Sequence, residues 1–417
     1  MAATINTNVN SLNAQRNLGM SASSLATSMQ RISSGLRVNS AKDDAAGLAI
    51  SERMNTQIRG QTVGARNAND GISLAQTAEG ALGKVGDMLQ RMRELAVQAS
   101  NATNSIADRK ALQSEVKQLA DEIDRVAKQT SFNGQKILDG TFAGAVFQVG
   151  ANSGDVAALG SLANTTTKGL ADVVYAYDHV TGIDATAISG TDLSAITDAS
   201  TLNISVTGSA DKIDLGTLKG ASSGSERLGQ LVEAINRKTA DTGVTAFLTK
   251  DSSTGKFTID LLSSKLDSNG DSATVTLTGF TATNFGFAAG AVGQVGANGG
   301  SAISATTTST DALGIDTLTV NTQANAWVAL VKIDSAIDQV NSARADLGAL
   351  QSRFESAVAN IEIQIENLAA ARGRIVDADF AKETANLSRT QILQQAGTAM
   401  VAQANQLPQG VLQLLKG

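Results

Sequence analysis

The sequence of 417 residues contains few of the side chains on which enzyme active sites are most often built. It has a single histidine, His179, and no cysteine. A nucleophile–histidine relay could therefore use only His179, and neither a disulfide nor a cysteine-based metal site can form. His179 stands beside Tyr175, Tyr177 and Asp178. We interpret it as a loop residue and not as a catalyst or a metal ligand.

Two segments have the composition of ligand-binding loops, but each lacks an essential residue. The glycine-rich run from Gly290 to Gly300 has no Lys-Ser/Thr ending and opens no helix, so we interpret it as a linker and not as a phosphate loop. Asp267 to Asp271 has the spacing of a Ca²⁺ loop, but Thr278 stands at the twelfth position, where a bidentate Glu is needed. We therefore expect no catalytic residue, no metal and no cofactor.

The composition favours long helices over a thick globular core. Aromatic residues make up only 3% of the chain, and the single proline, Pro408, leaves helices elsewhere unbroken. A net charge of −6 argues against a nucleic-acid partner, which would require a basic patch. No stretch is long and apolar enough to span a membrane, and the first residues lack the features of a signal peptide. If the protein leaves the cell, its export must depend on another signal.

Apolar residues recur at alternating three- and four-residue steps at both ends of the chain, and not in its middle. This spacing, about 3.5 residues, keeps one stripe of a helix facing a partner helix. One helix cannot bury its own stripe, so we expect both ends to be largely disordered in the free monomer and to order when several copies supply partner surfaces. The predicted assembly interface comprises Ile5, Val9, Leu12, Leu18, Leu25, Met29, Ile32, Leu36, Leu393, Met400, Leu407, Val411 and Leu414.

Helical periodicity continues inward from both ends. Apolar seams run through residues 51–100 and 105–128, with a turn of polar residues between them, and a third seam runs through residues 330–375. Because short connections favour antiparallel neighbours, we predict a long antiparallel helical rod, coiled-coil-like, built from both chain ends. Residues 132–138 and 146–149 are predicted to form a strand pair, a β-hairpin beside the rod, with turns at Asn-Gly and Asp-Gly.

The middle of the chain changes to the alternation typical of strands. We predict strands at residues 202–206, 256–262 and 273–277, and one helix from Ser225 to Ala240. Glycine, serine and aspartate separate these segments. The predicted fold class is therefore mainly α, with an inserted α+β domain between the two halves of the rod.

Several long motifs at both ends resemble bacterial flagellin. They are Arg31-Ile-Ser-Ser-Gly-Leu-Arg-Val-Asn-Ser and the following residues to Ser51, then Leu89-Gln-Arg-Met-Arg-Glu-Leu-Ala-Val-Gln, residues 132–138, Arg374-Ile-Val-Asp-Ala-Asp-Phe-Ala, and residues 391–409. The resemblance covers roughly residues 1–150 and 313–417 and is specific, because the motifs occur in the right order. In the insert, Leu231-Val-Glu-Ala-Ile-Asn followed by Thr242-Gly-Val-Thr-Ala is similar to a repeat module of flagellins and hook-associated proteins.

The resemblance implies a non-catalytic subunit that polymerises into the flagellar filament for swimming motility. Flagellins are exported unfolded through the flagellar type III apparatus, and they are added at the distal tip under a cap protein. The resemblance also implies five segments. They are residues 1–44 (first half of an inner-tube helical domain), 45–175 (rod domain with hairpin), 176–311 (solvent-facing variable insert), 312–375 (C-terminal rod helix) and 376–417 (second half of the inner-tube domain).

The resemblance further implies partners besides other copies of the chain. These are the cap and hook-associated proteins and an export chaperone, which would hold the apolar run Val411, Leu412, Leu414 and Leu415. The flagellin segment that an animal innate-immune receptor recognises matches at Arg91, Leu95 and Glu115. The spacing of Arg91, Arg93 and Glu94 alone favours a solvated helix face with local ion pairs, and the motif match favours the receptor site or contacts between subunits.

Two other functions remain as alternatives. A hook–filament junction protein has flagellin-like ends, but the intact motif at residues 391–409 argues against it. A secreted enzyme or binding module on a coiled-coil stalk would need a reactive cluster within residues 176–311, and the sequence shows none there.

Overall fold

The computed structural model describes residues 7–186, 188, 193–198, 202–206, 212–251, 253–266, 273, 275–278, 301–303 and 314–416. The chain divides into two compact units, which are described separately. Unit 1 consists of Met1–Gly71, Val146–Ala157 and Arg353–Gly417, and unit 2 of Ile72–Ala145 and Ala158–Ser352. Ile5, the glycine-rich run and the Ca²⁺-like loop at residues 267–271 lie outside the described residues. For residues 407–416 the structure describes the backbone alone.

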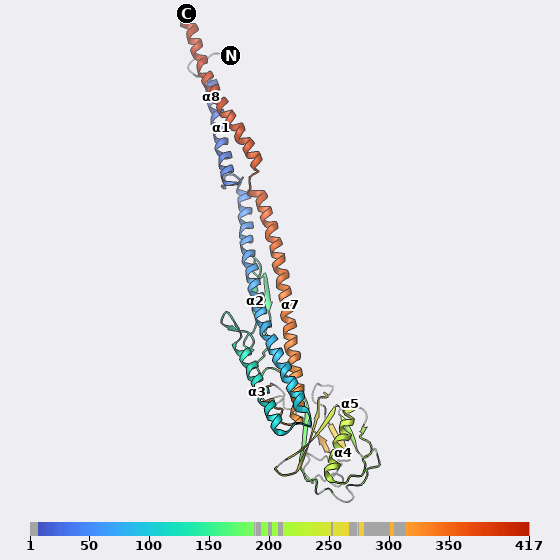
Figure 1. Cartoon of the computed structure of the whole chain (residues 1–417). Coiled ribbons are helices and arrows are strands. Elements are labelled where there is room, and N and C mark those ends of the chain that lie inside the picture. The colour runs from blue at the N-terminus through green and yellow to red at the C-terminus, as the bar shows by residue number, and fades with distance from the viewer. Residues whose placement is uncertain are drawn as a thin grey trace. The chain divides into compact units, whose positions relative to one another are not determined.

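Five long helices account for most of the secondary structure (Figure 1). They are α1 (Val9–Ser34), α2 (Ala45–Ser100), α3 (Ile106–Gln129), α7 (Gln323–Val376) and α8 (Phe380–Lys416). Side chains cap the first turns of α2 and α3. The Asp44 carboxylate accepts from the Gly47 N–H at 2.7 Å ahead of α2, and Ser105 and Asp108 form a capping box at α3. α1 ends at Gly35, whose φ of 72° is the left-handed conformation that glycine adopts most readily.

In unit 1, α1 and α8 run side by side and antiparallel (Figure 1). Their join is fixed at one end, where Leu36 and Asp377 form an isolated β-bridge and the Ala378 N–H donates to the Gly35 carbonyl at 2.9 Å. The short segments that follow α1 and precede α8 are thus held together by backbone hydrogen bonds.

Unit 1 also contains one end of α2, one end of α7 and the residues Val146–Ala157. Gly64 of α2 lets the backbone of this segment approach closely, since a Cβ there would lie 2.6 Å from the Val149 carbonyl oxygen. Asn67 Nδ2 donates to the Gln148 carbonyl at 2.9 Å. The Phe147 ring meets the Phe354 ring edge-on, with centroids 5.4 Å apart. The edge-on ring contact and the hydrogen bond from Asn67 therefore help to hold this segment on the helices.

The predicted strand pair between residues 132–138 and 146–149 was wrong in its partners. β1 (Ser131–Phe132) pairs with β2 (Gln135–Lys136), and β3 (Ala145–Gln148) pairs with β4 (Val156–Leu159). Asn133 and Gly134, at φ 48° and 80°, close the first hairpin locally. A two-residue turn with both φ values positive pairs the residues on either side of it, so β1 pairs with β2. Neither strand is then left to pair with β3.

In unit 2, three helices share one apolar core. The buried residues of α2 face those of α3 and α7, which confirms the predicted helix pairing and the mainly α fold class. The core residues of these helices are Leu82, Val85, Leu89, Met92, Leu95, Val116, Ile123, Ile333, Val340 and Leu347.

The rest of unit 2 contains the predicted α+β insert. β8 (Val244–Lys250) and β5 (Ala176–Ile183) flank β9 (Phe257–Ser263) in an antiparallel sheet. A second sheet has the order β11–β10–β6–β7, made of Ser301–Ile303, Val275–Thr278, Asn203–Val206 and Ile213–Asp214. α4 (Gly224–Arg237), followed by the short α5 (Thr239–Thr242), carries the apolar residues of the predicted helix.

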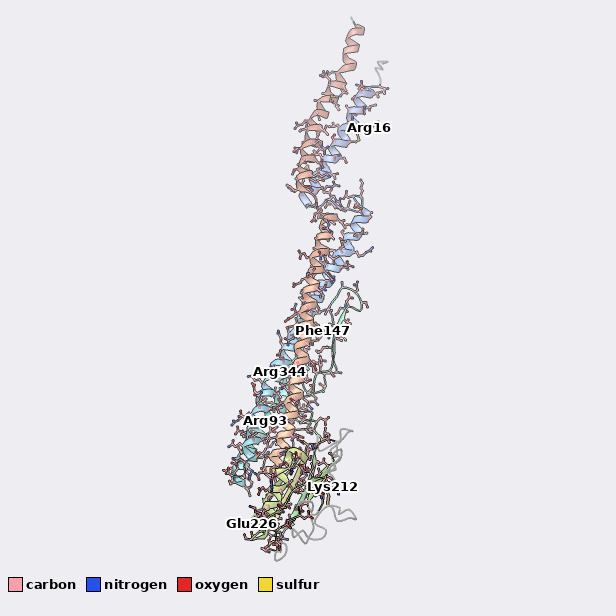
Figure 2. The ribbon with its side chains drawn as sticks, turned by 90° about the vertical axis from the view of Figure 1, so that its right-hand side faces the viewer. Arg16, Arg93, Phe147, Lys212, Glu226 and Arg344 are labelled. Atoms are coloured by element: carbon pink, nitrogen blue, oxygen red, sulfur yellow. The ribbon has the colours of Figure 1, made fainter. Side chains whose placement is uncertain are left out.

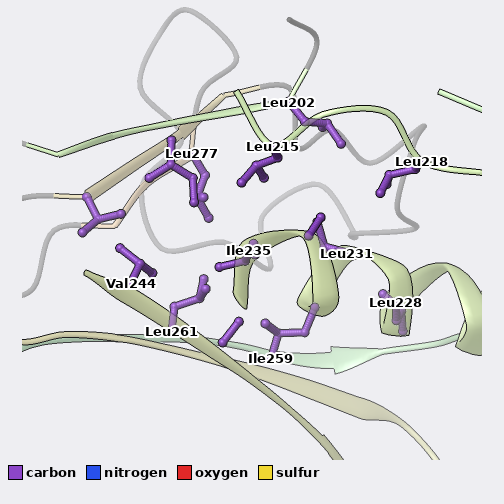
Figure 3. Close-up of a cluster of buried hydrophobic side chains, with 14 of the residues drawn as sticks. Leu202, Leu215, Leu218, Leu228, Leu231, Ile235, Val244, Ile259, Leu261 and Leu277 are labelled. Carbon is purple, nitrogen blue, oxygen red and sulfur yellow. The ribbon is translucent and has the colours of Figure 1, made fainter. Parts of the chain in front are cut away.

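The core of the insert lies between its helix and its two sheets (Figure 3). Leu231 and Ile235 of α4 have Leu202 and Leu215 on one side and Ile259 and Leu261 on the other (Figure 3). The strands predicted at residues 202–206, 256–262 and 273–277 are confirmed to within three residues. β5 was not predicted, so the interpretation of His179 as a loop residue was wrong. Among the described residues, no helix is both long and apolar enough to span a membrane.

Candidate assembly interface

The contact between α1 and α8 is polar at its most buried points. The buried residues of α1 are two serines, Ser11 and Ser28. Ser11 Oγ donates to Asn405 Oδ1 at 2.7 Å, and Ser28 Oγ donates to Glu383 Oε2 at 3.1 Å. Leucines or valines would normally occupy such positions in a two-helix pair. These hydrogen bonds satisfy the two buried serine hydroxyls.

Among the described residues, one ion pair lies within the same contact. Arg31 Nη1 donates to Glu383 Oε1 at 3.1 Å, and the Glu383 side chain retains only 8% of its accessible surface. Farther along, Asn8 caps α1 and donates through Nδ2 to the Ala404 carbonyl at 2.7 Å. Sequence reasoning missed these polar residues, since it followed the apolar seam alone. The polar interruptions of that seam are the signal that could have revealed them.

Part of the apolar seam lies at the edges of the pair, and part lies half-buried within it. Val9 is 64% exposed and Met400 is 65% exposed, and Leu12, Met29 and Leu393 are also exposed. Leu18, Leu25, Ile32 and Leu36 are half-buried. The side chains of Ile5, Leu407, Val411, Leu412, Leu414 and Leu415 lie outside the described residues. One pair of helices therefore leaves much of the seam uncovered.

Further exposed apolar residues lie on unit 1 beyond the predicted set. Figure 2, with Arg16 labelled on α1, shows the side chains that stand out from the pair. An apolar side chain in water costs free energy that burial recovers, at roughly 25 cal/mol per Å². Where such residues form a contiguous patch, the patch marks an interaction surface. The additional residues are Met20, Ile50, Val63, Ile363, Phe380 and Ile392.

The predicted receptor residues occupy two different environments in unit 2. Arg91 Nε donates to Glu115 Oε1 at 3.0 Å, and its Nη1 donates to Glu94 Oε2 at 2.9 Å. These hydrogen bonds, to Glu94 first and then to Glu115, raise the pKa of Arg91. Arg91 is exposed and Glu115 is partly exposed, whereas Leu95 is buried in the three-helix core. Only the first two can touch a partner directly, and Leu95 can act only by supporting the helix.

Arg93 lies on the other side of the same helix segment. Its Nε donates to Asp334 Oδ1 of α7 at 2.6 Å, and this hydrogen bond raises the pKa of Arg93 (labelled in Figure 2). Both side chains are about half exposed. Exposed pairs contribute little to stability, so this one is a local bridge between α2 and α7.

The single histidine is part of a small polar cluster on the insert. His179 on β5 stacks on Tyr177, with ring centroids 5.5 Å apart, and the Tyr177 hydroxyl donates to Asp260 Oδ1 at 3.0 Å. Burial raises the pKa of the Asp260 carboxyl. Within the described ranges, no group of three or more histidine or acidic side chains could hold a metal ion. The cluster contains no activated nucleophile.

Comparison with known proteins agrees with the resemblance at both ends. The family profile for the bacterial flagellin N-terminal helical region matches residues 5–143. The profile for the C-terminal helical region matches residues 330–415, and that for the flagellin hook IN motif matches residues 201–260. The first two matches include α1, α2 and α3 at one end and nearly all of α7 and α8 at the other.

Relatives extend the match across the whole chain. Flagellin D of Vibrio anguillarum is 38% identical over 418 residues, with 100% of both chains covered. Polar flagellin A of Vibrio parahaemolyticus is 40% identical over 418 residues, and B-type flagellin of Pseudomonas aeruginosa is 37% identical over 501 residues, each with 100% of both chains covered. The chain belongs to the bacterial flagellin family.

Proposed function

We propose that this flagellin builds the filament through the apolar edges of its α1·α8 pair, which order and interlock when neighbouring copies cover them. The chain is a structural subunit of the flagellar filament, as its family membership indicates. The observation that carries the proposed mechanism is the distribution of side chains in the pair. The buried residues of α1 are the two serines, while Val9, Leu12 and Met400 are exposed.

The five predicted segments remain part of this proposal. Residues 1–44 and 376–417 would form the inner wall of the filament. Residues 45–175 and 312–375 would form its outer wall, and residues 176–311 would form the solvent-facing insert. The insert supports this division, since it has a core of its own between two sheets and α4.

The nearest alternative is a hook–filament junction protein. The relatives that match over the full chain are named flagellins, which favours the filament subunit. The two functions also differ in a measurable property, because a junction protein stops after a short ring whereas a filament subunit elongates.

We expect that removal of residues 1–36 abolishes filament growth. The deletion removes α1 and therefore half of the pair whose edges must be covered. The full chain, seeded with fragments or treated with precipitating salt, should give long filaments by electron microscopy, and the truncated chain none. Circular dichroism should show that the helices of unit 2 remain. Filaments of normal length from the truncated chain would rule out the mechanism.

As a flagellin, the chain functions in an extracellular filament. We propose that it reaches the filament through the flagellar type III apparatus and is added under the cap protein, next to the hook-associated proteins at the base. We propose no catalytic role, because the His179 cluster offers no nucleophile and the family is a structural one.

We also propose that an export chaperone holds the last turns of α8, at Val411, Leu412, Leu414 and Leu415. This stretch is rich in leucine, and it belongs to the helix that needs partners. A chain that lacks residues 411–417 should lose binding to the chaperone in a pull-down from the native cell. The matched deletion of residues 1–7 should retain it. Equal binding by both truncated chains would place the chaperone site elsewhere.

For the animal innate-immune receptor, we propose that Arg91 and Glu115 form the accessible part of the site. Arg91→Ala removes an exposed guanidinium that Glu94 and Glu115 hold in place. A hydrogen bond from this charged group to the receptor would contribute ~1.5–3 kcal/mol, so receptor signalling in a reporter cell should fall by about tenfold or more. Lys238→Ala, which breaks a comparable surface ion pair on the insert, is the control and should leave signalling unchanged. Equal responses to the two variants would exclude Arg91 from the site.

A further inference from the structure

The apolar residues of the two terminal helices do not define a single alignment between them. On α1 the half-buried Leu18, Leu25 and Ile32 recur every seven residues, and on α8 Thr390, Gly397 and Ala404, which are buried or lie against α1, recur every seven residues as well. A slip of one heptad, about 10.5 Å along the axis, would bring equivalent positions of the two helices opposite each other again. Hydrophobic contact alone therefore permits several registers.

The polar contacts occur in one register only, the same one that the backbone join at Leu36 and Asp377 holds at its end of the pair. Asn8 with Ala404, Ser11 with Asn405, and Arg31 with Glu383 all belong to the same antiparallel alignment. A one-heptad slip in one direction would bring Glu383 opposite Ser21 and Ser24, away from any arginine of α1. A slip in the other direction would carry Glu383 past the end of α1 and place Asn405 opposite Leu18. Either slip would leave a buried polar group without its partner.

We propose that the Arg31–Glu383 ion pair, with Ser28 as the second donor to Glu383, specifies the register of the α1·α8 pair. The inference rests on the proposed function, because the register sets where each exposed apolar edge meets the neighbouring copy. A wrong register would shift the edge of α8 by two helical turns relative to that of α1. These residues position the assembly surface and need not touch the neighbour.

The geometry of the ion pair fits a role in specificity better than a role in stability. Glu383 is buried, and the buried Arg31 Nε has no acceptor among the described residues, so the desolvation of the pair is incompletely compensated. Such pairs are often replaced by apolar residues at no loss of stability, whereas removal of one partner is strongly destabilising. Single polar residues within a helix pair are known to fix its register.

The absence of cysteine from the chain permits a direct measurement of register. A Cβ at Gly397 would lie 3.7 Å from Leu18 Cβ, within the range of a disulfide. Leu18→Cys with Gly397→Cys reports the observed register. Leu25→Cys with Gly397→Cys and Leu18→Cys with Thr390→Cys report slips of one heptad in either direction. Full-length chains are assembled, oxidised mildly and separated on non-reducing gels, which distinguish disulfides within a chain from those between chains.

With Arg31 and Glu383 present, the in-register disulfide should exceed each slipped one by at least about tenfold. In the Arg31→Leu, Glu383→Leu background the yields of the three disulfides should become comparable. Two leucines can pack in the observed register or in one slipped by a heptad, so they favour none of the three. The charge swap Arg31→Glu, Glu383→Arg keeps an ion pair at the same place and should restore the preference for the in-register disulfide.

Two results would overturn the proposal. One is an unchanged preference for the in-register disulfide in the double-leucine background. The other is that the charge-swapped chain lacks this preference. The second result can be measured even if the double-leucine chain does not assemble. Filament growth is scored separately by electron microscopy, so a chain that never elongates counts against the proposed function, and a wrong disulfide pattern in good filaments counts against the register.

Discussion

Met400→Asp should abolish polymerisation while leaving the isolated chain as stable as before. Met400 is 65% exposed on α8, so the substitution removes almost no contact within the chain, and its effect on the free energy of unfolding should be within ~0.5 kcal/mol. In the filament, covering this position would bury a carboxylate without a partner, at a cost of several kcal/mol. The critical concentration for assembly should therefore rise by about a hundredfold or more, since each ~1.4 kcal/mol corresponds to a factor of ten.

Leu266→Asp is the matched control for this prediction. Leu266 is similarly exposed, at 52%, but it lies on the insert, which the proposal assigns to solvent. Its substitution should leave the critical concentration unchanged, as measured by sedimentation of assembled filaments. If the two variants assemble equally well, the edge of α8 is not covered in the filament and the proposed interface is wrong. If Met400→Asp unfolds the monomer by circular dichroism, the residue contributes to the fold and not only to assembly.

The helices were predictable from sequence because their signal is local and repeated. Caps such as Ser105 with Asp108, and apolar residues at three- and four-residue steps, determine where α3 lies and which side it buries. The α+β character of the insert was predictable for a similar reason, since strand alternation and turn residues are local too. The assembly role followed from the seam at both chain ends.

The partners of the strands and the interior of the α1·α8 pair were not predictable in the same way. Strand pairing depends on contacts distant in sequence, and the Asn133–Gly134 turn closed a hairpin that left β3 to pair with β4. The apolar seam predicted that α1 packs against another helix, but not that Ser11 and Ser28 would be its buried residues. In an isolated pair of helices, hydrogen bonds and an ion pair decide which side faces inward, and apolar residues can remain at the edges for other copies to cover.

Phe354→Ala should destabilise unit 1 by about 3–5 kcal/mol, the usual cost of removing a buried aromatic side chain. Phe354 is 1% exposed, its ring meets Phe147 edge-on, and it fills the space above Gly71, where a Cβ would lie 2.9 Å from the ring. Because that ring anchors Val146–Ala157 on the helices, hydrogen exchange in this segment should quicken before the rest of the unit opens.

Phe380→Ala provides the control, since the same side chain is removed from a position on α8 that is 61% exposed. It should change the free energy of unfolding by no more than ~0.5 kcal/mol, while its effect on assembly should be the larger one. Denaturant unfolding of monomers, followed by circular dichroism, compares the two variants directly. Equal losses of stability would mean that the 146–157 segment is not held by its aromatic contact, and that the hydrogen bond from Asn67 to Gln148 is its main attachment.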